Sequence, residues 1–241
     1  MLPIKPRISV CIATFNGEKF IRQQLESILT QLSDDDEVII SDNCSTDSTV
    51  SIINSIKDRR IFCFSFDIKG VVFNFENSLI KSRGDIIIIS DQDDIWLEGK
   101  VTRICQELEF FDLVVTNCKV VDENLNIIHE SLFNLIRPGI GIIKNLVRNS
   151  YTGCCMAFNK KIYHAILPFP CDLPMHDWWI GLSAEIIGSV KFINDPYILY
   201  RRHGLNASTL STPSELSFRK KISLRVVMLK NLIFRFVLKS K

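Results

Sequence analysis

The stretch Asp85-Ile-Ile-Ile-Ile-Ser-Asp-Gln-Asp-Asp94 decides the fold that we expect for this chain. Its four consecutive isoleucines predict a short strand that is buried on both faces, as in a parallel sheet. Three carboxylates follow within four residues, and carboxylates this close repel one another unless a cation lies among them. Ions such as Mg²⁺ bind carboxylate oxygens and complete their coordination with water and substrate phosphates. The stretch therefore ends either in a metal-dependent phosphate site or in an acidic loop that caps the next helix.

Apolar runs and helical periodicity alternate along the chain before this stretch. Strands are expected over residues 8–13, 37–40 and 61–66, and helices over 19–32, 45–56 and 73–81. Such alternation predicts βαβ units, an α/β fold and a mostly parallel central sheet flanked by helices. Right-handed crossovers place the C-terminal ends of parallel strands along one edge. The polar clusters at 14–17, 41–47 and 91–94 are therefore expected to meet there, where open α/β sheets bind ligands.

The second half of the chain is less regular. Strands are expected over 113–116, 119–122, 151–158, 190–193 and 197–200, and helices over 140–147 and 176–187. The sequence contains no Walker-type phosphate loop and no Gly-x-Gly-x-x-Gly pattern, which argues against kinase-like and NAD-dependent activities.

Length and composition limit the class of protein. The chain has 241 residues, 46% hydrophobic and 23% charged, which excludes a disordered chain and suits one α/β domain with a small appendage. The first seven residues are too polar for a secretory signal, and no uncharged stretch approaches the ~18–20 residues that cross a bilayer. The eight cysteines lack zinc-type spacing, so we expect reduced thiols in a cytosolic protein.

The net charge of +2 conceals a division along the chain. Eight basic residues and no acidic one follow Phe218, which leaves 21 basic and 27 acidic residues, a net charge of −6, before them. Residues 213–241 are expected to form a basic amphipathic helix. Its apolar face would carry Ile222, Val226, Leu229, Ile233 and Phe236.

A basic amphipathic helix of this kind is typical of a membrane-surface anchor. The alternatives are a helix docked on the body with its cations outward, and a nucleic-acid patch. We expect no nucleic acid as a partner, because the tail lacks stacking aromatics and a groove-binding motif.

Three ordered blocks carry a resemblance to a known family. They are Ile8-Ser-Val-Cys-Ile-Ala-Thr-Phe-Asn-Gly17, then Ser41-Asp42 with Ser45-Thr-Asp47, then Ser90-Asp-Gln-Asp-Asp-Ile-Trp96. In order and spacing they resemble the signature of family 2 glycosyltransferases, inverting enzymes with the GT-A fold.

Three later blocks narrow the resemblance. At 152–154, 176–179 and 200–204 the chain is similar to bacterial rhamnosyl- and hexosyltransferases that build O-antigen and other surface polysaccharides. The resemblance spans roughly residues 8–210. It implies a GT-A glycosyltransferase domain over 1–212, followed by the C-terminal helix.

The resemblance implies roles on the nucleotide side of the site. Thr14 and Asn16 would line the base and ribose, and Asp42 would contact the base. Asp91 and Gln92 would complete the nucleotide-sugar site.

The same resemblance implies a metal set of Asp93, Asp91 and His203. These residues would hold a divalent cation, Mn²⁺ or Mg²⁺, that neutralises the departing diphosphate. A histidine in the core or facing solvent is the alternative for His203. Arg201 would either screen the diphosphate or carry surface charge.

On the acceptor side the resemblance implies Asp177 as the catalytic base. The alternative is an acidic residue in the first turn of a helix, facing the helix dipole. The acceptor and sugar pocket would include Thr152, Gly153, His176 and Trp178, although Trp178 could also fill the core.

The implied function is the inverting transfer of a sugar from a UDP-hexose or dTDP-rhamnose donor. The implied acceptor is an undecaprenyl-diphosphate-linked sugar, which places the enzyme at the cytoplasmic face of the bacterial inner membrane. Two alternatives remain: a nucleotidyltransferase with the same sheet architecture, and a non-catalytic subunit that binds nucleotide sugars. The loop at 14–19 lacks the Gly-rich basic sequence typical of nucleotidyltransferases. This favours a glycosyltransferase over a nucleotidyltransferase.

Overall fold

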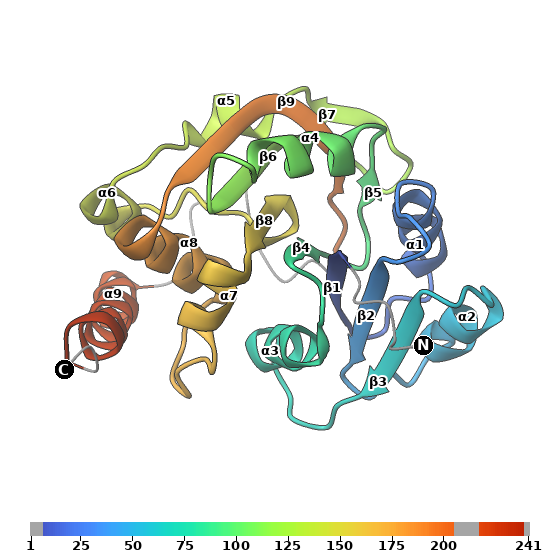
Figure 1. Cartoon of the computed structure of the whole chain (residues 1–241), viewed down its shortest axis with the longest axis horizontal. Helices are drawn as coiled ribbons and strands as arrows, with labels where there is room; N and C mark the ends of the chain where they lie inside the picture. The colour runs from blue at the N-terminus through green and yellow to red at the C-terminus, as the bar shows by residue number, and fades with distance from the viewer. Residues whose placement is uncertain (1–6, 205–216, 239–241) are drawn as a thin grey trace.

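The computed structural model describes residues 7–204 and 217–238. Its N-terminal half consists of β1 (Ile8–Thr14), α1 (Ile21–Leu29), β2 (Glu37–Asp42), α2 (Thr49–Ser55), β3 (Ile61–Ser65), α3 (Val71–Lys81) and β4 (Ile86–Ser90). β1 pairs with β2 and β4, and β2 pairs with β3, in each case parallel. α3 lies on one side of these strands, and α1 and α2 lie on the other (Figure 1). The predicted alternation of strands and helices is confirmed for this half.

The C-terminal half extends the same sheet. It consists of β5 (Ile95–Trp96), α4 (Lys100–Glu107), β6 (Leu113–Val121), β7 (Ile127–His129), α5 (Leu132–Ile136), α6 (Ile142–Val147), the 3₁₀ turn η1 (Gly153–Cys155), β8 (Met156–Asn159), α7 (Lys160–Ile166), α8 (His176–Ile187) and β9 (Val190–Arg201). The helix α9 (Phe218–Ile233) and the π-helical turn η2 (Phe234–Leu238) follow.

The nine strands have the order β3-β2-β1-β4-β8-β6-β9-β5, with β7 paired to β6. β8 runs antiparallel to both β4 and β6, whereas β6 and β9 are parallel. The sheet is therefore parallel in its first half and mixed in its second. This differs from the mostly parallel sheet that the sequence predicted, because β8 enters beside β4 from the opposite end.

The strands predicted over 113–116 and 119–122 form one continuous strand, β6. Those predicted over 190–193 and 197–200 likewise form one strand, β9. We expected a break near Asn117, but a bulge in the parallel β6–β9 pairing keeps this residue within the strand. The Asn117 side-chain amide donates hydrogen bonds to the carbonyl of Asn194 and to the hydroxyl of Ser131, both at 2.8 Å. Because the sheet itself satisfies this polar side chain, no break is needed.

Several short elements also differ from expectation. The strand predicted over 151–158 is limited to β8, because Gly153–Cys155 forms a turn. The helices α4, α5 and α7 and the short strands β5 and β7 were not predicted. α7 begins at a polar cap that periodicity alone does not reveal: the Asn159 side chain accepts hydrogen bonds from the backbone amides of Lys161 and Ile162.

The central strand β4 fixes the position of the acidic stretch. Ile87, Ile88 and Ile89 are fully buried, and burial of each contributes about 1.5–3 kcal/mol. The pairing of β4 with β1 and β8 then places its C-terminal end beside the C-terminal end of β1 and the N-terminal end of β8. Residues 91–94 and the turn η1 therefore lie at the same edge of the sheet.

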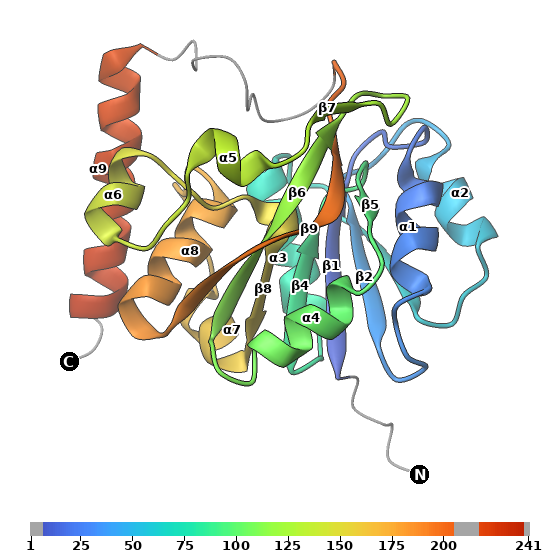
Figure 2. The ribbon, with the colours of Figure 1, turned by 90° about the horizontal axis from the view of Figure 1, so that it is seen from above.

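The helix α9 packs along the outside of α6, α7 and α8 (Figure 2). Met228 and Leu232 are buried, and the Asn231 amide donates to Asp172 Oδ1 at 2.8 Å. The Arg235 guanidinium donates to the carbonyls of Ala165 and Leu167 at 3.0 and 2.9 Å. α9 and the turn η2 that follows it are thus held by specific contacts to the body.

The apolar face that the sequence predicted for this helix points largely outward. Ile222, Val226, Leu229 and Ile233 are exposed, whereas Phe236 packs against the core. Residues 213–216 and 239–241 of the predicted helix lie outside the described part of the chain, and the boundary at 212 stays a prediction. None of the helices that the structure describes is long and apolar enough to span a bilayer.

Candidate functional site

A cavity of about 560 Å³ opens at the C-terminal edge of the parallel strands. It brings together residues from both halves of the chain. Of the predicted site residues, those that line it are Thr14, Asp91, Gln92, Asp93, Thr152, Gly153, His176 and Asp177. Asn16, Asp42, His203 and Trp178 do not line it.

Thr14 and Asp42 form a buried pair at the ends of β1 and β2. The Thr14 hydroxyl donates to Asp42 Oδ1 at 2.9 Å, and the backbone amide of Ser45 donates to Asp42 Oδ2 at 2.9 Å. Both carboxylate oxygens of Asp42 therefore have partners within the chain. In this conformation Asp42 shapes the loop beside Thr14, which itself faces the cavity.

The loop after β1 is hydrogen-bonded both to the loop after β2 and to the acidic loop after β4. Asn16, in the left-handed backbone region at φ 49°, accepts a hydrogen bond from the Thr46 amide through its side-chain oxygen at 2.9 Å. The Gln92 amide accepts from the backbone nitrogen of Phe15 at 2.9 Å and donates to its carbonyl at 3.1 Å. Gln92 thus joins the loop after β1 to the acidic loop after β4.

Asp93 and His203 meet at 2.7 Å between Asp93 Oδ2 and His203 Nε2, although 110 residues separate them. Both side chains are nearly buried, at 10% and 5% exposure. The imidazole also lies 4.8 Å from the ring of Phe20, which fixes its plane. Burial and the charge of Asp93 raise the pKa of the neighbouring Asp91 carboxyl to about 8.

Asp93, Asp91 and His203 offer donor types that suit a divalent cation, although the structure does not bring one ligand atom from each within 4.8 Å of the other two. Carboxylate oxygens and a neutral imidazole are ligands that Mn²⁺ accepts, and Mg²⁺ binds the carboxylates. A cation would also offset the repulsion that raises the Asp91 pKa. Asp93, Asp91 and His203 are thus the residues that could hold it.

Arg201 is hydrogen-bonded to the acidic loop. Its backbone amide donates to Asp94 Oδ1 at 3.1 Å, and its Nε donates to the carbonyl of Asp93 at 2.8 Å. The guanidinium lies 4.6 Å from the ring of Phe20 and donates to Gln23 Oε1 at 3.0 Å. Arg201 is buried and lies outside the cavity lining, so neither expectation for it, diphosphate screening or surface charge, is met.

Asp177 occupies the first turn of α8 and faces the cavity. Its Oδ1 accepts a hydrogen bond from the Trp178 backbone amide at 2.6 Å. Burial raises the pKa of the Asp177 carboxyl to about 7, because water no longer stabilises the charged form. A carboxyl with a pKa near neutrality is suited to accept and release a proton.

His176 lies beside it with unused hydrogen-bonding capacity. Neither ring nitrogen has a partner among the described residues, and the ring stacks on Phe75 at 4.2 Å. Burial lowers the His176 pKa to about 3, so the imidazole is neutral. Gly153 packs closely against this ring, since a Cβ there would lie 2.9 Å from His176 Nε2. Both ring nitrogens are therefore buried at the edge of the cavity without a hydrogen-bond partner among the described residues.

Trp178 belongs to the core. Its indole nitrogen donates to the carbonyl of Asn145 at 2.8 Å, and Trp179 makes the equivalent bond to Ile166 at 3.1 Å. The placement of Trp178 in the acceptor pocket is therefore not supported, because its polar edge is already paired within the body.

The sequence interpretation missed several residues near the site. Asn74 and Lys69 line the cavity, and Asn74 donates to the carbonyl of Thr14 at 3.1 Å. Asn74 lies on the buried face of α3 among apolar residues. A polar residue at a buried position of the helical pattern is the sequence signal that marks it. Lys100 is fully buried and donates to the carbonyl of Cys154 at 3.2 Å, with its ammonium 3.9 Å from the centre of the Trp96 ring. No local pattern marks it.

Comparison with known proteins decides the family. The family model described as "Glycosyl transferase family 2" matches residues 9–167, which include β1 to α7 and the acidic loop. The chain belongs to glycosyl transferase family 2. This glycosyltransferase has relatives among bacterial enzymes and shares the GT-A fold with solved structures, as expected from the sequence.

Two relatives and one structure illustrate the similarity. The dTDP-rhamnosyl transferase RfbG of Shigella flexneri is 28% identical over 93% of this chain and 81% of the relative. The Escherichia coli enzyme WfaP, a UDP-Glc:α-D-GlcNAc-diphosphoundecaprenol β-1,3-glucosyltransferase, is 35% identical over 44% of this chain and 41% of its own length. The crystal structure of S. aureus TarS 1–349 with UDP-GlcNAc superposes with a TM-score of 0.69 at 15% identity, covering 95% of this chain and 73% of TarS.

Proposed function

We propose that this glycosyltransferase inverts the anomeric carbon of a nucleotide-activated hexose or rhamnose as it transfers the sugar to a lipid-linked acceptor. The observation that carries the proposal is that Asp177, a buried carboxyl with a pKa of about 7, shares one cavity with the Asp91–Asp93 loop. A proton acceptor and a cation-binding loop on one cavity are what a direct displacement at a sugar diphosphate requires.

In the proposed step, a hydroxyl oxygen of the acceptor forms a bond to the anomeric carbon while the bond from that carbon to the diphosphate breaks. The bonding electrons leave with the diphosphate oxygen, and the hydroxyl proton passes to Asp177. Attack opposite the leaving group inverts the configuration. A cation held by Asp93, Asp91 and His203 supplies positive charge for the diphosphate.

The printed names of two relatives motivate the substrate classes. RfbG is a dTDP-rhamnosyl transferase, and WfaP uses UDP-Glc and an acceptor on diphosphoundecaprenol. We therefore propose a UDP-hexose or dTDP-rhamnose donor and an undecaprenyl-diphosphate-linked sugar acceptor. His176 and Gly153 are the proposed contacts to the sugars. Thr14 and Gln92, with Asn16 and Asp42 behind them, are proposed to shape the nucleotide end.

A panel of nucleotide sugars with Mn²⁺ or Mg²⁺ tests the proposal. At 100 times its Kd the true donor should stabilise the folded state by about 2.7 kcal/mol and raise Tm by several degrees. The same donor should then give an inverted product with an undecaprenyl-linked acceptor, read by NMR. Release of pyrophosphate would instead indicate a nucleotidyltransferase, and metal-dependent binding without turnover would indicate a binding subunit. No stabilisation by any nucleotide sugar would refute the proposal.

We further propose that the enzyme associates with the cytoplasmic surface of an anionic membrane through α9. Val226 and Leu229 are exposed on this helix, and Ile143 and Val147 are exposed on the adjacent α6. The basic residues of α9 complement anionic headgroups, at about 1 kcal/mol each near such a surface. An apolar surface of two helices beside basic side chains is suited to interfacial binding.

Vesicle flotation tests this surface. The wild-type protein should float with vesicles containing phosphatidylglycerol, and less with phosphatidylcholine alone. The double variant Val226→Ser/Leu229→Ser should bind on the order of 100-fold more weakly, since two apolar side chains lose their burial in lipid. Ile127→Ser/Ile128→Ser is the matched control, because both residues are exposed on β7, away from α9. Equal flotation of both double variants would argue for a helix that serves only to dock on the body.

A further inference from the structure

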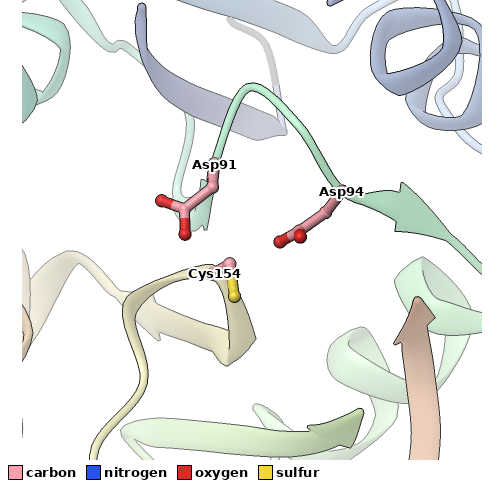
Figure 3. A group of neighbouring side chains, drawn as sticks. All are labelled: Asp91, Asp94 and Cys154. Atoms are coloured by element: carbon pink, nitrogen blue, oxygen red, sulfur yellow. The ribbon is translucent and has the colours of Figure 1, made fainter. Parts of the chain in front are cut away.

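A group of three side chains beneath the acidic loop is not used in the proposed reaction as a set. Asp91 and Asp94 flank the turn of this loop, and Cys154 comes from η1. One ligand atom from each lies within 4.8 Å of the other two. In Figure 3 the carboxylate of Asp94 points toward the space above Cys154, the carboxylate of Asp91 points down on the other side of that space, and Cys154 lies below them.

One buried oxygen atom of this group, in the carboxylate of Asp94, has no hydrogen-bond partner among the described residues. Asp94 is 1% exposed, and its Oδ1 accepts from the Arg201 amide at 3.1 Å. Its Oδ2 has no hydrogen-bond partner among the described residues. A buried carboxylate oxygen without a partner is costly, on the order of 1–3 kcal/mol, and indicates a place for a ligand. This observation is independent of the clustering itself.

The chemistry of the donor atoms selects the ligand. Mg²⁺ and Ca²⁺ prefer oxygen-only coordination, whereas thiolates favour ions such as Zn²⁺ and Cd²⁺. Two carboxylates, one thiolate and one water would complete a tetrahedral zinc site. Zinc bonds of about 2.0–2.3 Å require the three donor atoms to approach one another further, by side-chain rotation.

We propose that Asp91, Asp94 and Cys154 bind a thiophilic divalent cation of the zinc class. Binding forms a sulfur–metal bond, and the thiol proton is released to solvent. The site differs from the proposed set of Asp93, Asp91 and His203 but shares Asp91 with it. Zinc-class ions should therefore inhibit the transfer supported by Mn²⁺ or Mg²⁺, and this last consequence alone rests on the proposed function.

Cadmium titration tests the binding directly, because a cadmium–thiolate bond gives an ultraviolet charge-transfer band. The titration uses the full chain with Cys44→Ser and Cys171→Ser, which remove the two exposed thiols. We expect one cadmium ion per chain with a band from one thiolate. Adding Cys154→Ser should abolish the band, and adding Asp94→Asn should weaken binding at least tenfold. Adding Cys118→Ser, a buried thiol outside the group, should leave the band unchanged.

The outcomes separate this proposal from the proposed function. Absence of the band, or its persistence in the Cys154→Ser protein, overturns the cation site whether or not the enzyme transfers sugar. If the Cys154 variant does not fold, ¹¹³Cd NMR of the protein that retains Cys154 decides the matter, because the shift reports the number of sulfur ligands. A signal without sulfur coordination overturns the proposal. Conversely, the band should appear even if no donor is ever found.

Discussion

Replacement of Asp177 by asparagine is expected to lower kcat for sugar transfer by about 10²–10⁴-fold, while donor binding persists. Asparagine keeps the size of the side chain and the acceptor oxygen for the Trp178 amide. It has no basic carboxylate to take the proton from the attacking hydroxyl. The loss should therefore appear in kcat, with little change in the donor affinity measured by thermal shift.

Asp195→Asn is the matched control, since Asp195 is an exposed carboxylate on β9 and lies outside the cavity lining. This variant should transfer sugar at the wild-type rate. Asp177→Asn should also keep the wild-type Tm within a few degrees, which separates a chemical defect from unfolding. Transfer at the normal rate by a folded Asp177→Asn protein would exclude Asp177 as the base.

The pH dependence of the wild-type rate tests the same assignment. Burial raises the pKa of Asp177 to about 7. The base must be ionised to accept a proton, so the rate should rise as pH increases through about 7 and level off above it. A rate that is already constant from pH 5 upward would contradict this role.

Replacement of Asp93 by asparagine is expected to reduce transfer by on the order of 10³-fold, because cation stabilisation of the diphosphate contributes several kcal/mol. In this variant the loss of activity should include weaker metal-dependent binding of the donor. Mn²⁺ should no longer increase the affinity for the donor, because the amide that replaces the Asp93 carboxylate is uncharged and a weak ligand for the cation. His203→Ala should change metal dependence in the same direction with a smaller effect, since Asp93 and Asp91 remain.

Isothermal titration of the donor with and without Mn²⁺ measures this effect. Asp35→Asn removes an exposed carboxylate before β2, at the opposite end of the strand from the site, and should leave the Mn²⁺ effect intact. If Asp93→Asn retains the full Mn²⁺ effect, the cation is held elsewhere.

The local elements of the fold followed from the sequence because hydrophobic periodicity is a property of neighbouring residues. The isoleucines of β4 and the apolar stripes of α1 and α3 predicted their elements within a few residues. The break expected at Asn117 was wrong for a reason outside its neighbourhood. The partners of its side chain, Asn194 and Ser131, come from other segments of the chain.

The candidate site also contains residues that the sequence predicted and residues whose orientation only the tertiary structure shows. The ordered blocks named Asp91, Asp93 and Asp177, and the sheet edge brings all three to one cavity. Trp178 shows the limit, because a tryptophan beside a site residue looks the same in sequence whether it faces a sugar or Asn145. Its side-chain direction depends on how α8 packs, which periodicity in a nearly all-apolar helix does not report.

By itself the sequence determined the strand-and-helix order of the N-terminal half, the acidic loop at the end of β4, and the family through its ordered blocks. Only the tertiary structure decided that Arg201 is buried under this loop, that Lys100 lies behind Cys154, and that α9 turns its predicted apolar face outward. The physical reason is distance along the chain. Contacts between segments such as residues 91–94 and 200–203 depend on strand order and on the β6–β9 bulge, and no local pattern encodes either.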